Sequence, residues 1–264
     1  MRKIFGISMI LALILAVLFK AGPAKAITNG QPDGEAHPYV GRFITDVDHD
    51  GQPDFYPFCS GTLLSSTVFL TAGHCLRIAL ENGWTDYWVS FDSVFQPGES
   101  PVIKVETAVM HPEYNPLTNN NDVSLMILQT PVTGRGYGQI PAVNLLKQMK
   151  EAGTLSNQVF TNVGYGATME STGVPVPNFD GVRRWSTSPF IALLPNNLVL
   201  LENNHATEQG GICLGDSGGP SFLGNTNVIA SITSWGDGTC RAISGSQRLD
   251  IPSVGSFISS YVGP

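Results

Sequence analysis

The segment Gly215–Pro220 reads GDSGGP, and it guides the interpretation of the whole 264-residue chain. A serine that attacks a carbonyl group lies on a tight turn, where backbone N–H groups can receive the oxyanion that forms. The glycines around Ser217 permit the unusual dihedral angles of such a turn. The segment predicts a nucleophilic serine, although a glycine-rich turn without activity would have the same composition.

The order of the histidines separates two hydrolase layouts that share this motif. Residues 215–219 also fit the motif G-x-S-x-G, the nucleophile elbow of α/β-hydrolases, in which the triad histidine follows the serine in the chain. All five histidines of this chain precede Ser217: His37, His49, His74, His111 and His205. The sequence also lacks alternating strand and helix patterns, so we expect the order His, Asp, Ser.

Two further segments supply residues in that order. Thr71–Cys75 reads TAGHC and places His74 beside a cysteine. Asn121–Leu128 reads NDVSLMIL, so Asp122 leads an apolar strand that can bury its carboxylate. A lone histidine or aspartate is more often structural than catalytic, but the TAGHC and GDSGGP blocks together fix eleven residues. This combination favours a catalytic triad.

These motifs make the chain resemble the trypsin/chymotrypsin-like serine peptidases. Two shorter matches add to them: residues 164–166 read GYG, similar to the family's G-W-G, and residues 234–236 read SWG, as in its substrate-binding strand. The resemblance runs from Ile27 to the C-terminal helix. It implies an all-β fold of two packed six-stranded antiparallel β-barrels, and a secreted serine endopeptidase that works through an acyl-enzyme.

The resemblance also assigns boundaries and residue roles. It places a peptidase domain at 27–264, with the first barrel at about 27–135, the second at about 136–250 and the helix at about 252–262. The implied triad is His74, Asp122 and Ser217, with the N–H groups of Gly215 and Ser217 as oxyanion donors. The implied substrate-binding residues are Gly211, Ile212, Ser234, Trp235 and Gly236, with Ser234 also beside Asp122. Of three possible cysteine pairings, it selects Cys59–Cys75 and Cys213–Cys240. No cofactor or metal is expected.

Gly211 suggests which substrate side chain is accepted at P1. It stands six residues before Ser217, where trypsin-like enzymes carry an aspartate that binds Arg or Lys. Ile212 is bulkier than the family's usual small residue and should narrow the pocket, whereas Gly236 leaves one wall open. We therefore expect small or apolar P1 side chains, with Arg and Lys poor. Arg248 would favour an acidic side chain as a second choice.

The first 26 residues have the features of a secretory signal peptide. Arg2 and Lys3 precede an uncharged, mostly apolar run at Ile4–Phe19, and residues 24–26 read AKA, a site for signal peptidase. A membrane anchor is the alternative, but the run is shorter than the ~20 residues that a span needs. We therefore expect secretion, to the extracellular space or the periplasm.

Removal of this segment bears on activation. Residues 27–30 read ITNG and resemble the family's new N-terminus, whose ammonium pairs with the aspartate before the serine, here Asp216. Cleavage after Ala26 would create that ammonium at Ile27 directly. The alternative is cleavage a few residues earlier, which would leave a short propeptide.

Charge and composition narrow the partners and the fold class. Without residues 1–26 the chain has 10 basic and 21 acidic residues, a net charge of −11, which disfavours nucleic acids. We expect a monomer that binds protein or peptide substrates and, once the signal is removed, no membrane. With 29 glycines, 18 prolines and 13% charged residues, the chain is typical of a turn-rich β protein.

Local patterns predict individual elements. Strands are predicted by apolar and β-branched runs at six places: 58–64, 68–71, 102–109, 123–128, 158–163 and 228–234. Residues 167–178 are predicted to form a long surface loop. A helix is predicted to begin at Pro252 and end at Gly263, with an apolar stripe of Val254, Phe257, Ile258, Tyr261 and Val262.

Two questions stay open at this stage. Asp46, Asp48, Asp50 and Asp54 have the spacing of a calcium loop, but Pro57 stands where the bidentate glutamate belongs, and an ordinary solvated turn has the same composition. The second question is function: a binding protein that lost its activity, or a hydrolase that prefers esters, are the alternatives to an endopeptidase.

Overall fold

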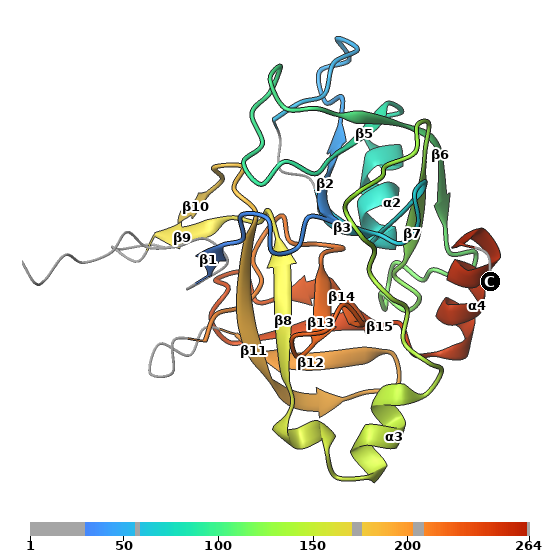
Figure 1. Ribbon diagram of the computed structural model, residues 1–264, viewed down its shortest axis with the longest axis vertical. Helices are drawn as coiled ribbons and strands as arrows, with labels where there is room; N and C mark the ends of the chain where they lie inside the picture. Colours follow the sequence, from blue (N-terminus) through green and yellow to red (C-terminus); the bar gives the residue numbers. More distant parts are fainter. Residues whose placement is uncertain (1–29, 56–58, 171–175, 203–208, 263–264) are drawn as a thin grey trace, which may run out of the picture.

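The computed structural model describes residues 30–55, 59–170, 176–202 and 209–262. Two closed antiparallel barrels lie one above the other (Figure 1). The first closes in the order β2-β3-β4-β7-β6-β5. Its strands are β2 (Val40–Thr45), β3 (Cys59–Leu63), β4 (Val68–Thr71), β5 (Tyr87–Ser90), β6 (Ile103–Met110) and β7 (Ser124–Leu128). The all-β prediction of two six-stranded barrels is confirmed.

The second barrel closes through the pairing of β11 with β8, in the order β8-β13-β14-β15-β12-β11. Its strands are β8 (Val159–Gly164), β11 (Arg184–Leu193), β12 (Asn197–Leu201), β13 (Pro220–Leu223), β14 (Ile229–Gly236) and β15 (Ile243–Arg248). A short strand, β1 (Gln31–Pro32), lies along β11. The six predicted strands coincide with β3, β4, β6, β7, β8 and β14 to within a few residues.

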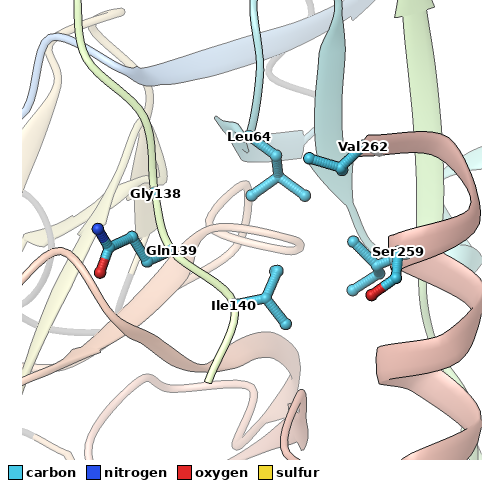
Figure 2. A pocket seen from close by; sticks show the side chains of 7 residues that line it. Leu64, Gly138, Gln139, Ile140, Ser259 and Val262 are labelled. Atoms are coloured by element: carbon cyan, nitrogen blue, oxygen red, sulfur yellow. The ribbon is translucent and has the colours of Figure 1, made fainter. Parts of the chain in front are cut away.

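Helix α4 (Pro252–Val262) confirms the predicted C-terminal helix, while Gly263 lies outside the described residues. Val254 and Ile258 are fully buried and belong to one apolar cluster with residues of the first barrel, so the last element of the chain packs against the first barrel. Between α4 and residues 138–140 lies a hollow of about 350 Å³, which Leu64 and Ile140 line from one side and Ser259 and Val262 from the other (Figure 2).

The beginning of the described chain is tied to both barrels by a buried charge pair. The guanidinium of Arg183 is fully buried and donates from Nε to Asp33 Oδ2 at 2.8 Å. Its Nη1 group donates to the carbonyls of Val40 and Phe91 in the first barrel, at 3.0 and 2.9 Å. His37 donates from Nδ1 to the other oxygen of Asp33. These contacts hold residues 33–40 between the barrels.

Sequence patterns missed two α-helices and a hairpin. Helices α2 (Gly73–Glu81) and α3 (Leu145–Glu151) are short, and neither has a side-chain N-cap or an acidic first turn. A further helical turn is η1 (Leu155–Asn157). The predicted surface loop at 167–178 is wrong in part: β9 (Thr168–Glu170) pairs with β10 (Val176–Asn178), and Ala167 and Met169 are buried. Within the described ranges, no helix combines the length and the apolar character needed to cross a bilayer.

Candidate active site

His74 and Asp122 meet at the open end of the first barrel. Strand β4 leads directly into α2, which starts one residue before His74, and Asp122 lies just before β7. The ring Nδ1 of His74 donates to Asp122 Oδ2 at 2.8 Å, and its backbone N–H donates to Oδ1 at 2.7 Å. Because a carboxylate only accepts, Nδ1 carries the proton. Nε2 of the neutral ring is then left as an acceptor.

The second barrel completes the surroundings of Asp122, which is fully buried. Ser234 of β14 donates its hydroxyl to Asp122 Oδ2 at 2.5 Å. Gln247 of β15 accepts from the backbone N–H of Asp122 at 3.1 Å. Ser234 lies beside Asp122, where the resemblance implied it, whereas no sequence signal singled out Gln247. The aspartate is therefore fixed by both barrels.

Ser217 lies on a turn that packs against the histidine segment. Its carbonyl accepts from the N–H of Ser60 at 2.8 Å, and the N–H of Gly218 donates to the carbonyl of Thr233 at 2.8 Å. Gly218 has φ of +77°, and a Cβ there would lie 2.2 Å from Thr71 Oγ1 and 2.6 Å from the backbone N of Ala72. Only glycine fits this position. The turn that carries Ser217 thus rests on the TAGHC segment that carries His74.

Ser60 is a second contributor that the sequence did not indicate. Besides its backbone bond to Ser217, its hydroxyl donates to the carbonyl of Gly215 at 3.0 Å and accepts from the N–H of Tyr165 at 2.9 Å. It stands next to Cys59, whose disulfide to Cys75 anchors the segment of His74. Ser60 of β3 therefore supports the turn that carries Ser217 through both its backbone and its side chain.

Asp216 is buried beneath this turn. Its carboxylate accepts from the N–H groups of Cys213 and Gly166, each at 2.8 Å. The GYG motif makes room for it, since a Cβ on Gly164 would lie 2.1 Å from an oxygen of Asp216. Burial raises the pKa of Asp216 to about 7. Ile27, its expected partner, lies outside the described residues.

The cysteines pair as the resemblance implied. Cys59 bonds Cys75, with 6.4 Å between their Cα atoms, and Cys213 bonds Cys240, with 5.2 Å. The first disulfide joins β3 to α2. The second joins the serine turn to the segment that follows β14. Each bridge braces one wall of the site.

A cavity of about 220 Å³ opens beside Ser217, lined by residues of the segments 212–217 and 233–240. The Cδ1 atom of Ile212 would lie only 2.9 Å from a Cβ on Gly236, so the side chain of Ile212 lies against the cavity wall at Gly236. Trp235 is partly exposed, and its ring packs on Gly245.

The structure places an acid beside Gly211 that the sequence did not indicate. The carboxylate of Glu202, which follows β12, occupies the place of a side chain at Gly211: its Oε2 lies 1.5 Å from the ideal Cβ position. The sequence could not show this, because the two residues are brought together only by the fold of the second barrel. Arg248 does not face the pocket as an anion receptor, since its guanidinium pairs with Asp250 at 2.8 and 2.9 Å.

The acidic loop of the first barrel is held by its own backbone. Carboxylate oxygens of Asp46, Asp48 and Asp50 lie within 4.8 Å of one another. Asp46 accepts from the N–H groups of Asp50 and Gly51, and Asp54 accepts from that of Val47. These bonds are those of a solvated turn, and Pro57 lies outside the described residues.

Comparison with known proteins gives one consistent result. The family model described as Trypsin matches residues 31–249. A trypsin from Saccharopolyspora erythraea is 29% identical over 216 residues, which cover 78% of this chain and 84% of that protein. The vitellin-degrading protease of Bombyx mori is 28% identical over 194 residues, 69% of this chain and 68% of that protein. Serine protease 56 of Homo sapiens is 31% identical over 199 residues, 69% of this chain and 31% of that protein.

Solved structures agree with the architecture. HL collagenase superposes with a TM-score of 0.68 at 20% identity, covering 89% of this chain and 98% of that one. The protein HBP gives a TM-score of 0.67 at 17% identity, covering 89% and 96%. At these identities the likeness concerns the fold alone. The family match, which covers most of the chain, carries the assignment: this protein belongs to the trypsin family and is a serine endopeptidase.

Proposed function

We propose that His74, Asp122 and Ser217 form the catalytic triad of this endopeptidase. The observation that carries the proposal is the fully buried Asp122, which holds His74 through both the ring and the backbone. The serine turn, built on glycines, packs against the same segment. Within the described part of the chain, neither Gly215 nor Ser217 donates its backbone N–H to another group, and this supports their role as oxyanion donors.

In the proposed mechanism, Ser217 Oγ attacks the scissile carbonyl and its proton passes to Nε2 of His74. Asp122 keeps the ring oriented and stabilises its charged form. The N–H groups of Gly215 and Ser217 bind the oxyanion, each contributing ~10²–10³ in kcat. His74 then donates its proton to the leaving amine, and water hydrolyses the acyl-enzyme by the same steps in reverse.

We propose further that residues 1–26 are a signal peptide, that 27–264 form the mature domain, and that the protein is secreted. Its two disulfides suit an oxidising compartment. A new N-terminus at Ile27 would then pair with Asp216 and order the oxyanion donors. The raised pKa of Asp216 supports this, because burial without a cation disfavours its carboxylate.

For the P1 side chain, we propose a preference for small or apolar groups at neutral pH and below. Ile212 narrows the pocket toward Gly236. Burial raises the pKa of Glu202 to about 8, so this acid is mostly uncharged at pH 7. Under those conditions Glu202 offers Arg or Lys no counter-charge, and Asp237, the acid that lines the cavity, already accepts from the N–H groups of Thr239, Arg241 and Ala242.

Substitution of the serine tests the triad. Ser217→Ala should lower kcat for a peptide substrate by ~10⁶, with an unchanged melting temperature, and should abolish labelling by an organophosphonate. Undiminished turnover would refute the assignment. If the unmodified protein neither cleaves peptides nor reacts with the phosphonate, it is a binding protein instead. Faster cleavage of an ester than of the matched amide would identify a hydrolase that prefers esters.

A further inference from the structure

Ser60 links the first barrel to both residues that carry the proposed oxyanion donors. It is fully buried on β3, and its hydrogen bonds reach segments of the second barrel. Its backbone N–H donates to the carbonyl of Ser217 at 2.8 Å. Its hydroxyl donates to the carbonyl of Gly215 at 3.0 Å and accepts from the N–H of Tyr165 at 2.9 Å. One residue therefore holds the carbonyl groups of both Gly215 and Ser217.

The orientation of Gly215 depends on its hydrogen-bonded neighbours. Its φ is +93°, and it lacks the Cβ that restricts the backbone of other residues. Among the residues that the structure describes, its N–H has no acceptor. The peptide group that follows Gly215 is held at both ends, because its carbonyl accepts from the Ser60 hydroxyl and its N–H, that of Asp216, donates to the carbonyl of Cys213 at 3.0 Å. Without the hydroxyl, one of these two ends is free.

Ser217 is held by contacts that do not need the side chain of Ser60. Its carbonyl accepts from the backbone N–H of Ser60, and a residue with a different side chain at position 60 would still supply that N–H. The next residue, Gly218, donates its N–H to the carbonyl of Thr233 at 2.8 Å. A substitution that removes only the Ser60 hydroxyl therefore acts on Gly215 and leaves the supports of Ser217 in place.

We propose that Ser60 is a positioning residue whose hydroxyl, acting through the carbonyl of Gly215, aims the N–H of Gly215 at the oxyanion. This inference rests on the proposed function, in which Gly215 and Ser217 are the oxyanion donors. Donors that are already aimed when the charge develops need no reorganisation in the transition state. The hydroxyl should therefore accelerate the chemical step and leave substrate binding unchanged.

Removal of the hydroxyl is the first test. Ser60→Ala should lower kcat for a peptide substrate by ~10–100-fold, less than the ~10²–10³-fold that follows complete loss of an oxyanion donor. KM should change little. The acid limb of the pH profile of kcat/KM should not shift, because the partners of the hydroxyl are Gly215 and Tyr165 and not His74 or Asp122. Titration with the phosphonate gives the concentration of active enzyme.

A peptidyl trifluoromethyl ketone reports on the oxyanion site directly. When Ser217 Oγ adds to the ketone, a C–O bond forms, the carbonyl π electrons become the oxyanion, and the serine proton passes to His74. The Ki of this inhibitor should rise in Ser60→Ala by about the factor by which kcat/KM falls. The corresponding secondary alcohol forms no adduct and should bind equally to both proteins.

Ser90→Ala is the matched control. Ser90 is buried on β5, and its hydroxyl also donates to a carbonyl, that of Pro101 at 2.9 Å, and accepts from a backbone N–H, that of Asp92 at 3.4 Å. Its loss should lower the melting temperature but leave kcat and Ki unchanged. If Ser60→Ala does not fold, Ser60→Thr and Ser60→Val replace it, because they are similar in size and differ in the hydroxyl. The Thr enzyme should then be faster by ~10-fold or more.

The outcomes separate this inference from the proposed function. If Ser217→Ala is inactive but Ser60→Ala has the kcat and Ki of Ser90→Ala, the triad stands and the role of Ser60 is overturned. A rise in KM, together with weaker binding of the alcohol, would show that Ser60 shapes the substrate pocket and would also overturn it. Full activity in Ser217→Ala would refute the proposed function itself, and the oxyanion role of Ser60 with it.

Discussion

Replacing Asp122 by Asn tests the triad at its buried end. All three hydrogen bonds at this side chain are donated to it: Oδ1 accepts from the His74 backbone, and Oδ2 accepts from the His74 ring and from Ser234. An asparagine must turn an NH₂ group toward one of these two positions. If it faces the ring, Nδ1 becomes the acceptor and the ring proton moves to Nε2. His74 can then no longer take the proton of Ser217.

The opposite orientation sets the NH₂ group against the backbone N–H of His74, which sits at 2.7 Å from the present oxygen. The repulsion there favours the first orientation, and with it the wrong tautomer. We expect kcat to fall by ~10⁴, the loss known for this tautomer change, which is about 5 kcal/mol of transition-state stabilisation. KM should change little, because the pocket is untouched.

The assay is peptide hydrolysis at pH 7–8 with enzyme whose folding is checked by its melting temperature. Asp86→Asn serves as the matched control, since Asp86 is half-exposed and pairs with Lys104 on the surface of the first barrel. The control should keep full activity. A folded Asp122→Asn enzyme that loses less than ~10-fold in kcat would refute the tautomer argument.

Two further predictions concern stability and activation. Arg183→Met should lower the free energy of unfolding by ~3–5 kcal/mol in urea titrations, because it leaves Asp33 buried without its cation; a loss below ~1 kcal/mol would contradict this. Burial by itself would raise the pKa of Asp33, but His37 and Arg183 hold that pKa below its ordinary value of 3.8. The stabilisation that the Asp33–Arg183 pair contributes should therefore be complete above about pH 4 and disappear in more acidic solution. The substitution Asp216→Asn should remove most peptidase activity, and so, separately, should an extension of the chain upstream of Ile27. N-terminal sequencing of active enzyme checks the effect of the extension, and an active form that begins before Ile27 would disprove it.

The sequence was sufficient for features that depend on local pattern or on a motif. The strands follow from apolar and β-branched runs, and α4 follows from its apolar stripe, of which Val254 and Ile258 are fully buried. The disulfides follow from the family resemblance, which the two bridges fit. Each of these features is encoded by residues close together in the chain or by the order of distinctive motifs.

What the sequence could not show depends on contacts between distant residues. Gln247 reaches the N–H of Asp122 from 125 positions away, and Ser60 reaches Gly215 from 155. Neither residue type is unusual, so no local pattern marks it. Glu202 stands only nine positions before Gly211, but the glycine alone suggested an empty space. Helix α2 was missed because its N-cap, Ala72, offers no side-chain hydrogen bond.

The site's geometry depends on how the two barrels pack together. Asp122 belongs to the first barrel but is fixed by Ser234 and Gln247 of the second. Ser217 belongs to the second barrel, and its carbonyl is held by Ser60 of the first. The apolar cluster that unites the barrels includes Phe222 from the second. A small shift between the barrels would therefore strain both hydrogen-bonded supports at once, since packed interiors deform little. Activity should accordingly be more sensitive than overall stability to substitutions at the interface between the barrels.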